Sequence, residues 1–265
     1  MLERERIGVG RTADVYAWAP GWVLKLYHPW WPLVKIEYEA QVGRAVHAAG
    51  VASPAVGDIV ALDGRYGLVY EHIAGPSMEC VLEAEPQRLD ELARTLAQLH
   101  AAMHSHTSGD LPPQRYLLEH HIDQASPVPL DGTLKQRARQ VLDTLPDGSQ
   151  LCHGDFHPGN VLMAPGRLTA IDWENACLGS PLADVARTLL LLETAHLHFP
   201  REQQDGDLPA GIMRFKEQYL QEYISLTRAD AALIAAWRLA VAAARLHEGI
   251  AVEEGYLRDL VAGRL

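Results

Sequence analysis

A change of pattern near residue 73 constrains the fold of this chain more than any other feature of its sequence. Before that point, short runs of β-branched and aromatic residues are separated by turns that contain Gly or Pro, as in "WVLKLY" and "YGLVYEHI". After it, apolar residues recur at helical spacing over much longer stretches. We therefore predict an α+β protein with two lobes, a small β-rich lobe over residues 1–72 and a larger, mainly helical lobe over residues 73–265.

One helix is expected to interrupt the strands, over residues 32–50, with Gly50 as its stop signal. Its predicted apolar face repeats every four residues and consists of Val34, Tyr38, Val42 and Val46. In the second lobe, the same kind of periodicity predicts helices over residues 86–104, 134–145, 184–197, 210–226 and 230–250.

Composition narrows the class of protein. The chain has 48% hydrophobic and 22% charged residues, as is usual for a globular protein, and its formal charge of −11 comes without a run of Lys or Arg. Nucleic acid and membranes are therefore not expected as partners, whereas a cationic small molecule would suit the charge. Three cysteines without CxxC spacing, a charged N-terminus and apolar runs too short to cross a bilayer predict a cytoplasmic protein without disulfides. No pattern indicates the oligomeric state.

Two glycines, Gly8 and Gly10, lie between the first two predicted strands in "IGVGRTADVYAW". Glycines at such a turn allow positive φ and let backbone N–H groups approach a phosphate closely. The same residues also suit an ordinary hairpin turn, so both interpretations stay open here. The segment is neither a Rossmann nor a P-loop motif, because no helix follows the glycines and the GxxxxGK pattern is missing.

Lys25 is a cationic residue inside the otherwise apolar strand "WVLKLY". It lies either at a solvated edge or next to an anionic ligand in a cleft. Glu37 and Glu39 on the following helix are candidate partners. An ion pair of this kind holds an ammonium group where phosphate oxygens arrive.

The segment "LCHGDFHPGN", residues 151–160, concentrates polar side chains around a Gly/Pro turn. One hypothesis is a hydrolytic metal site at His153, Asp155 and His157, but such sites usually take further ligands from elsewhere in the chain. The other hypothesis is phosphoryl transfer, which requires a carboxylate near the attacking hydroxyl group, together with an amide and a second carboxylate for Mg²⁺. Asp155, Asn160 and Asp172 supply these groups, because a predicted hairpin brings residues 160 and 172 together. Only this hypothesis accounts for Asn160 and Asp172, and we prefer it.

The motifs "HGDFHPGNVL" and "AIDWENACLGSPLADVART" resemble the catalytic loop and the metal-binding segment of the aminoglycoside phosphotransferase and choline kinase family. The similarity extends from about residue 5 to 190, and the C-terminal helices agree in character only. The resemblance implies a protein-kinase-like fold whose N-terminal lobe binds a nucleotide. It implies a kinase that transfers the γ-phosphate of ATP, or of GTP, to a hydroxyl group of a small molecule, with Mg²⁺ as cofactor.

The resemblance also implies a role for each matching residue. Asp155 would be the catalytic base, and Asn160 and Asp172 would be the ligands of Mg²⁺. His153 and Asp184 would brace the catalytic loop, whereas His157 has no assigned role. Nucleotide binding would fall to Gly8, Gly10, Lys25 with its partner Glu39, and the linker residues Glu71 and Ile73.

Two positions depart from the family pattern. Ala13 stands where a third glycine would be expected, and Tyr70 occupies the position behind the nucleobase, where a ring could favour guanine over adenine. The alternative function is a non-catalytic nucleotide-binding regulatory protein of the same fold. A protein kinase is less compatible, because HGD and DWE replace HRD and DFG and no APE segment follows.

The sequence does not identify the acceptor, which this family draws from antibiotics, choline-like amines, sugars and amino alcohols. Acidic residues near the C-terminus would suit a cationic acceptor such as an aminoglycoside or an amino alcohol. A solvated helix face is the simpler interpretation for most of these residues, which are Glu248, Glu253, Glu254 and Asp259.

Overall fold

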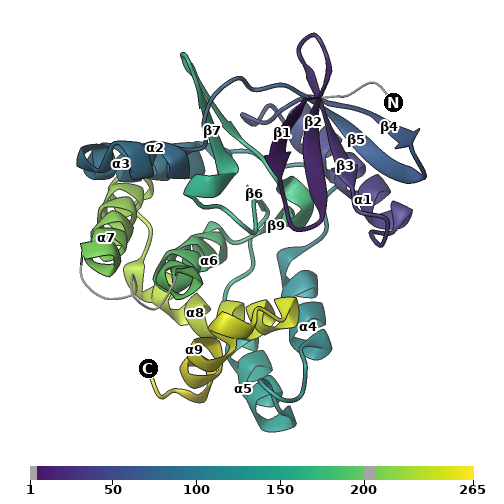
Figure 1. Ribbon diagram of the computed structural model, residues 1–265. Coiled ribbons are helices and arrows are strands. Elements are labelled where there is room, and N and C mark those ends of the chain that lie inside the picture. Colours follow the sequence, from purple (N-terminus) through teal and green to yellow (C-terminus); the bar gives the residue numbers. More distant parts are fainter. Residues whose placement is uncertain (1–4, 200–206) are drawn as a thin grey trace.

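A five-stranded antiparallel sheet forms the small lobe, in the order β1-β2-β3-β5-β4. The computed structural model describes residues 5–199 and 207–265, and Figure 1 shows the sheet beside a larger group of helices. The predicted α+β architecture with two lobes is confirmed. The strands follow the runs of β-branched and aromatic residues: β1 (Arg6–Val9), β2 (Ala13–Ala19), β3 (Trp22–Tyr27), β4 (Val56–Leu62) and β5 (Arg65–Glu71).

The helix α1 (Leu33–Ala48) connects β3 to β4 and packs against the sheet. Its predicted apolar face is wrong in part, because Val34 and Tyr38 are 66% and 39% exposed. Ile36 and Ala40 are buried instead. The buried side also includes the charged Glu39, which a pattern based on apolar residues alone does not count.

Helices make up most of the large lobe, and Gly50 lies beyond the end of α1 as predicted. The predicted helical regions are confirmed with shifted ends: α3 (Leu89–Met103), α5 (Gly132–Asp143), α6 (Pro181–Thr194), α7 (Asp207–Thr227) and α8 (Ala231–Arg245). Two further helices, α2 (Met78–Ala84) and α4 (Gln114–Gln124), were not predicted. Both bury too few apolar side chains to produce a clear helical repeat.

The predicted helix over residues 230–250 ends early. A 3₁₀ turn follows α8 at Leu246–Glu248, Gly249 takes a φ of +64°, and a separate helix, α9 (Ala251–Ala262), begins after it. The interpretation of the C-terminal acidic residues as a solvated face is wrong for Glu253. Its side chain is 0% exposed and bonds to Arg245 of α8.

Two short strand pairs hold the polar segments between the sheet and the helices (Figure 1). β6 (Gln150–Cys152) pairs with β9 (Cys177–Gly179). β7 (Val161–Ala164) pairs with β8 (Arg167–Ala170), which confirms the predicted hairpin. The segment after β6 and the segment after β8 therefore meet at the junction of the two lobes.

The largest apolar cluster lies mainly among the helices of the large lobe, and its largest buried side chains include Trp237, Tyr219, Tyr223 and Phe156. It also includes Val42 and Val46 of α1 and so continues into the small lobe. A smaller cluster joins α1 to the sheet through Ile36, Tyr27 and Leu68. Within the described ranges, no helix is both long enough and apolar enough to cross a membrane.

Candidate active site

The loop after β6 contains a glycine that no other residue replaces without strain. Gly154 has a φ of +78°, and a Cβ atom there would lie 2.4 Å from the carbonyl oxygen of Asn175. Only glycine tolerates both the conformation and the close approach. This approach brings the 153–160 loop against the segment that follows β8.

Asp184, in the first turn of α6, anchors the same loop. Its Oδ2 accepts a hydrogen bond from the backbone N–H of His153 at 2.6 Å, and its Oδ1 accepts one from Gly154 at 2.8 Å. Burial alone would raise the pKa of this carboxyl group, but bonds from His100 and His104 hold the pKa well below its usual range. Asp184 is therefore an ionised, buried residue that fixes the loop.

Two buried histidines complete the surroundings of Asp184. The Nε2 atoms of His100 and His104 lie 3.0 and 3.2 Å from its Oδ2, and their Nδ1 atoms lie 2.7 Å from the hydroxyl groups of Tyr219 and Tyr223. Burial and the neighbouring His104 lower the pKa of His100 to about 3, so that its ring is neutral at pH 7. The three possible ligand atoms are spaced as a metal would require. Each ring nitrogen already bonds to a protein group, however, which fits a structural network.

Asp155 follows Gly154 and directs its carboxylate toward Arg187 of α6, whose Nη2 lies 3.1 Å from Asp155 Oδ1. Burial acts to raise its pKa, but the charges of Arg187 and His157 outweigh burial and leave the pKa below its ordinary value. The side chain keeps 25% exposure. Asp155 is thus an accessible, ionised carboxylate that can accept a hydrogen bond or a proton from a hydroxyl group.

Asn160 and Asp172 meet at one end of the β7–β8 hairpin, as predicted. The N–H of Ile171 donates to the carbonyl of Asn160 at 2.9 Å. Asn160 Nδ2 donates to the backbone carbonyl of Asp155 at 2.9 Å, which leaves the amide oxygen available. Asp172 takes a φ of +65°, and its side chain is 42% exposed. An amide oxygen and a carboxylate are the hard donors that Mg²⁺ prefers, so these residues fit the expected ion.

A further carboxylate, Glu174, lies near Asp172 and was not predicted as a site residue. Burial and the charge of Asp172 raise its pKa to about 7, against the opposing charge of Lys25. Burial is the largest cause, so the raised pKa marks a partly desolvated carboxyl group beside the charge of Asp172. The signal in the sequence was the acidic residue of "DWE".

Lys25 connects the two lobes. Its Nζ lies 2.8 Å from Glu39 Oε1 and 2.9 Å from Asp172 Oδ1, so Glu39 is its helix partner. Burial acts to lower the pKa of Lys25, but Asp172 and Glu39 outweigh burial and raise the pKa well above its usual value. The hydroxyl groups of Tyr27 and Tyr70 donate to Glu39 at 2.6 and 2.7 Å. Tyr70 therefore directs its hydroxyl group toward this ion pair.

The glycine turn is present, although the conformational reason predicted for it is wrong. Neither Gly8 nor Gly10 has a positive φ, and Gly8 pairs with Val15 in the β1–β2 ladder. Gly10 is required by space, because a Cβ atom there would lie 2.9 Å from the carbonyl oxygen of Ala13. Its own N–H donates to that oxygen.

Glu71 and Ile73 lie at and just beyond the end of β5, where the chain passes to the large lobe. The N–H of Glu71 donates to the carbonyl of Ala55 at 2.9 Å, so a ligand would have to use the Glu71 carbonyl. The carbonyl of Ile73 accepts from Gly75 at 3.0 Å, so a ligand would use the Ile73 N–H. Together they offer one acceptor and one donor.

On the other side of Asp155 lies Arg187, which sequence reasoning missed, together with Glu248, which it named only as a possible partner of a cationic acceptor. Arg187 Nη2 also donates to Glu248 Oε1 at 2.5 Å, and Glu248 Oε2 accepts from Arg245 at 3.0 Å. His157 Nε2 lies 3.9 Å from Asp155 Oδ2. No local pattern predicts that Arg187 and Glu248 meet, since their positions depend on how α6 and the turn after α8 approach the loop.

Solved structures with the same fold include an aminoglycoside-3′-phosphotransferase of type VIII, with 18% identity, a TM-score of 0.58 and coverage of 92% of each chain. A choline/ethanolamine kinase family protein from Mesorhizobium loti has 20% identity and a TM-score of 0.58, covering 98% of this chain and 86% of that one. An aminoglycoside phosphotransferase in complex with AMP-PNP and hygromycin B has 19% identity and a TM-score of 0.59, covering 99% and 91%. The protein-kinase-like fold is confirmed. A search of curated proteins found no match.

The family follows from a match over most of the sequence. The model described as "Phosphotransferase enzyme family" matches residues 3–233, a range that contains the glycine turn, Lys25, the 153–160 loop and the β7–β8 hairpin. The resemblance drawn from two short motifs is confirmed, and the match extends it into α8. This chain belongs to the phosphotransferase enzyme family.

Proposed function

We propose that this protein is a kinase that transfers the γ-phosphate of ATP to a hydroxyl group of a small molecule, with Mg²⁺ as cofactor. One observation carries the proposal: Asp155, Asn160 and Asp172 converge at one end of a hairpin, and Lys25 lies 2.9 Å from Asp172. These are the groups that phosphoryl transfer requires for the acceptor, the metal and the nucleotide phosphates.

The chain's own residues would divide the work as follows. Asp155 would accept a hydrogen bond from the acceptor hydroxyl and then its proton, while Arg187 keeps the carboxylate in place. Lys25 would bind the nucleotide phosphates. Asn160 and Asp172 would hold Mg²⁺, which neutralises charge on phosphate oxygens when bound. Positioning and charge stabilisation supply most of the rate in reactions of this class.

The nucleotide would lie between the lobes. Gly8 and Gly10 would cover its phosphates, and the Glu71 carbonyl and Ile73 N–H would bond to its base. ATP is preferred as donor because two structural relatives are complexes with AMP-PNP and with ATP. GTP remains a test case. The ring of Tyr70, which lies close to the Lys25–Glu39 pair, occupies the position behind the nucleobase, where it would favour guanine over adenine.

Release of ADP or GDP across a panel of hydroxyl acceptors tests the proposal. We expect acceptor-dependent ADP release that EDTA abolishes and that excess Mg²⁺ restores. Nucleotide binding measured by calorimetry serves as the companion measurement. Binding without transfer to any acceptor would favour the regulatory alternative, and loss of binding as well would contradict the proposal.

A further inference from the structure

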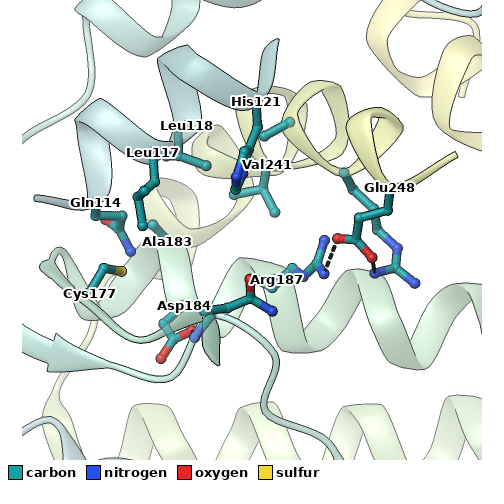
Figure 2. A pocket seen from close by; sticks show the side chains of 14 residues that line it. Gln114, Leu117, Leu118, His121, Cys177, Ala183, Asp184, Arg187, Val241 and Glu248 are labelled. Atoms are coloured by element: carbon teal, nitrogen blue, oxygen red, sulfur yellow. Dashed lines mark hydrogen bonds and ion pairs between the residues drawn. The ribbon is translucent and has the colours of Figure 1, made fainter. Parts of the chain in front are cut away.

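A pocket lies on the acceptor side of Asp155, between α4, α6 and α8 (Figure 2). Its volume is about 70 Å³, which is room for part of a small molecule rather than for a whole one. Gly154 lines it, and its wall residue Arg187 bonds to Asp155. An acceptor whose hydroxyl group lies at Asp155 would therefore extend into this pocket.

The carboxylates at this pocket are already paired. Glu248 accepts from Arg187 through one oxygen and from Arg245 through the other (Figure 2). Both oxygens of Asp184 bond to the catalytic loop, and Glu253, behind the pocket, bonds to Arg245 through both of its oxygens. Among the described residues that line the pocket, a cationic group would thus find no unpaired carboxylate.

One buried donor, by contrast, lacks a partner. The Arg187 side chain is only 10% exposed, yet its Nε makes no hydrogen bond to any residue that the structure describes. Its Nη2 serves both Asp155 and Glu248. Burying an N–H group without a partner is unfavourable. Because Nε has almost no exposed surface, a ligand oxygen would reach it only after the guanidinium group turns toward the pocket.

The rest of the wall is apolar or neutral. Leu117, Leu118 and Val241 contribute carbon surface. Burial and the neighbouring His247 lower the pKa of His121 to about 4, so this wall residue carries no charge at pH 7. A ligand carboxylate would lie near Glu248 and be repelled by it, which disfavours an anionic acceptor as well.

We infer that the acceptor is an uncharged hydroxyl compound, which presents an ether, hydroxyl or carbonyl oxygen to Arg187 and carbon surface to the leucine wall. The inference rests on the proposed function and names the substrate class within it. It differs from the cationic acceptor that the net charge of the chain would suit. Selectivity would arise because an ammonium group loses its hydration in the pocket without gaining a carboxylate.

Matched pairs of acceptors that differ in charge provide the test. The pairs are choline and 3,3-dimethylbutan-1-ol, ethanolamine and 2-methoxyethanol, and glucosamine and glucose. With the full chain, Mg²⁺ and ATP at pH 7.5, we expect kcat/KM to be about tenfold higher or more for the uncharged member. A preference for the charged members would overturn the inference.

Two neighbouring histidines offer a matched pair of variants. His121→Asp places an unpaired carboxylate in the pocket wall, whereas His120→Asp places the same charge on the exposed side of α4. We expect His121→Asp to move the charge preference about tenfold toward the cationic members, and His120→Asp to leave it unchanged. Equal effects of the two substitutions would show that the pocket does not distinguish acceptors by their charge.

The outcomes separate the two proposals. If no member of any pair reacts while Mg–ATP still binds and is slowly hydrolysed by water, the inference about the acceptor is overturned and the phosphoryl-donor site stands. If Mg–ATP does not bind, the proposed function itself fails. Turnover of the charged members alone would contradict only the inference.

Discussion

Asp172 and Asp184 are both aspartates that lie next to the 153–160 loop, but their surroundings are opposite. Asp172 is 42% exposed and bonds to Lys25, whereas Asp184 is 0% exposed and bonds to two histidines and two backbone N–H groups. The same contrast distinguishes the two sides of the proposed site. On the proposed nucleotide side, Asn160 and Asp172 keep side-chain oxygens available. On the proposed acceptor side, both oxygens of Glu248 are paired with arginines. The number of satisfied bonds therefore separates a carboxylate that can still accept a ligand from one that serves the fold.

The largest expected effect concerns Asp155, which stands between the two sides. Asp155→Asn should lower kcat about a thousandfold, because the amide cannot take the proton of the acceptor. The Kd of Mg–ATP should change little. Single-turnover kinetics and calorimetry check the two statements, with Asp147→Asn at an exposed ion pair as the control. Normal transfer by Asp155→Asn would contradict its assignment as the base.

The comparison of Asp172 with Asp184 predicts a difference in stability. Asp184→Asn should lower the free energy of unfolding by about 3 kcal/mol, because it leaves buried donors poorly paired. Asp172→Asn should cost less than about 1 kcal/mol, since its ion pair is partly exposed. Urea denaturation measures both, and equal losses would remove the distinction.

Acid should destabilise the network around Asp184. The pKa of His100 is about 3 in the folded state and 6.5 when unperturbed, so below pH 6.5 the unfolded state binds a proton that the folded state excludes. The stabilisation is complete above pH 6.5 and is lost as the pH falls toward 3. Between pH 6.5 and pH 5 this amounts to about 2 kcal/mol.

Denaturation at several pH values tests this dependence. His100→Gln should reduce the slope of stability against pH, whereas His120→Gln on the exposed side of α4 should not. His121, with a pKa of about 4, contributes in the same direction. A slope that His100→Gln leaves intact would show that His100 is not the group responsible.

The smallest predicted effect concerns metal-dependent binding. Asp172→Asn should weaken the affinity for ATP about tenfold in the presence of Mg²⁺, because one oxygen ligand of the ion loses its charge. Without Mg²⁺ the affinity should not fall, since Lys25 is then released from its partner. Titrations with and without EDTA distinguish the two conditions. An equal loss in both would place Asp172 outside the metal site.

Much of the fold could be predicted from local patterns, and the errors in that prediction have local causes. The strands were found because β-branched and aromatic runs end at turn residues. The exposed side of α1 was misplaced because Glu39 lies buried against Lys25 and the hydroxyl groups of two tyrosines. The break after α8 was missed because α8 is rich in alanine, and the residues between it and Gly249 do not interrupt the helical pattern.

The convergence of Asp155, Asn160 and Asp172 was predicted, whereas the contact between Arg187 and Glu248 was not. Asp155, Asn160 and Asp172 belong to one loop and one hairpin, so their meeting depends on short-range structure. Arg187 and Glu248 come from α6 and from the turn after α8, and meet only through the packing of distant helices. A pattern within one sequence does not contain that packing.

Gly154 has a consequence for regulation. In protein kinases that are switched by phosphorylation, an arginine pairs with the added phosphate, and HRD has its arginine where this chain has Gly154. Here a Cβ atom would lie 2.4 Å from the Asn175 carbonyl, so the backbone leaves no room for an arginine. Asp184 already holds the loop in place. Residue 154 therefore cannot supply the arginine that would pair with such a phosphate.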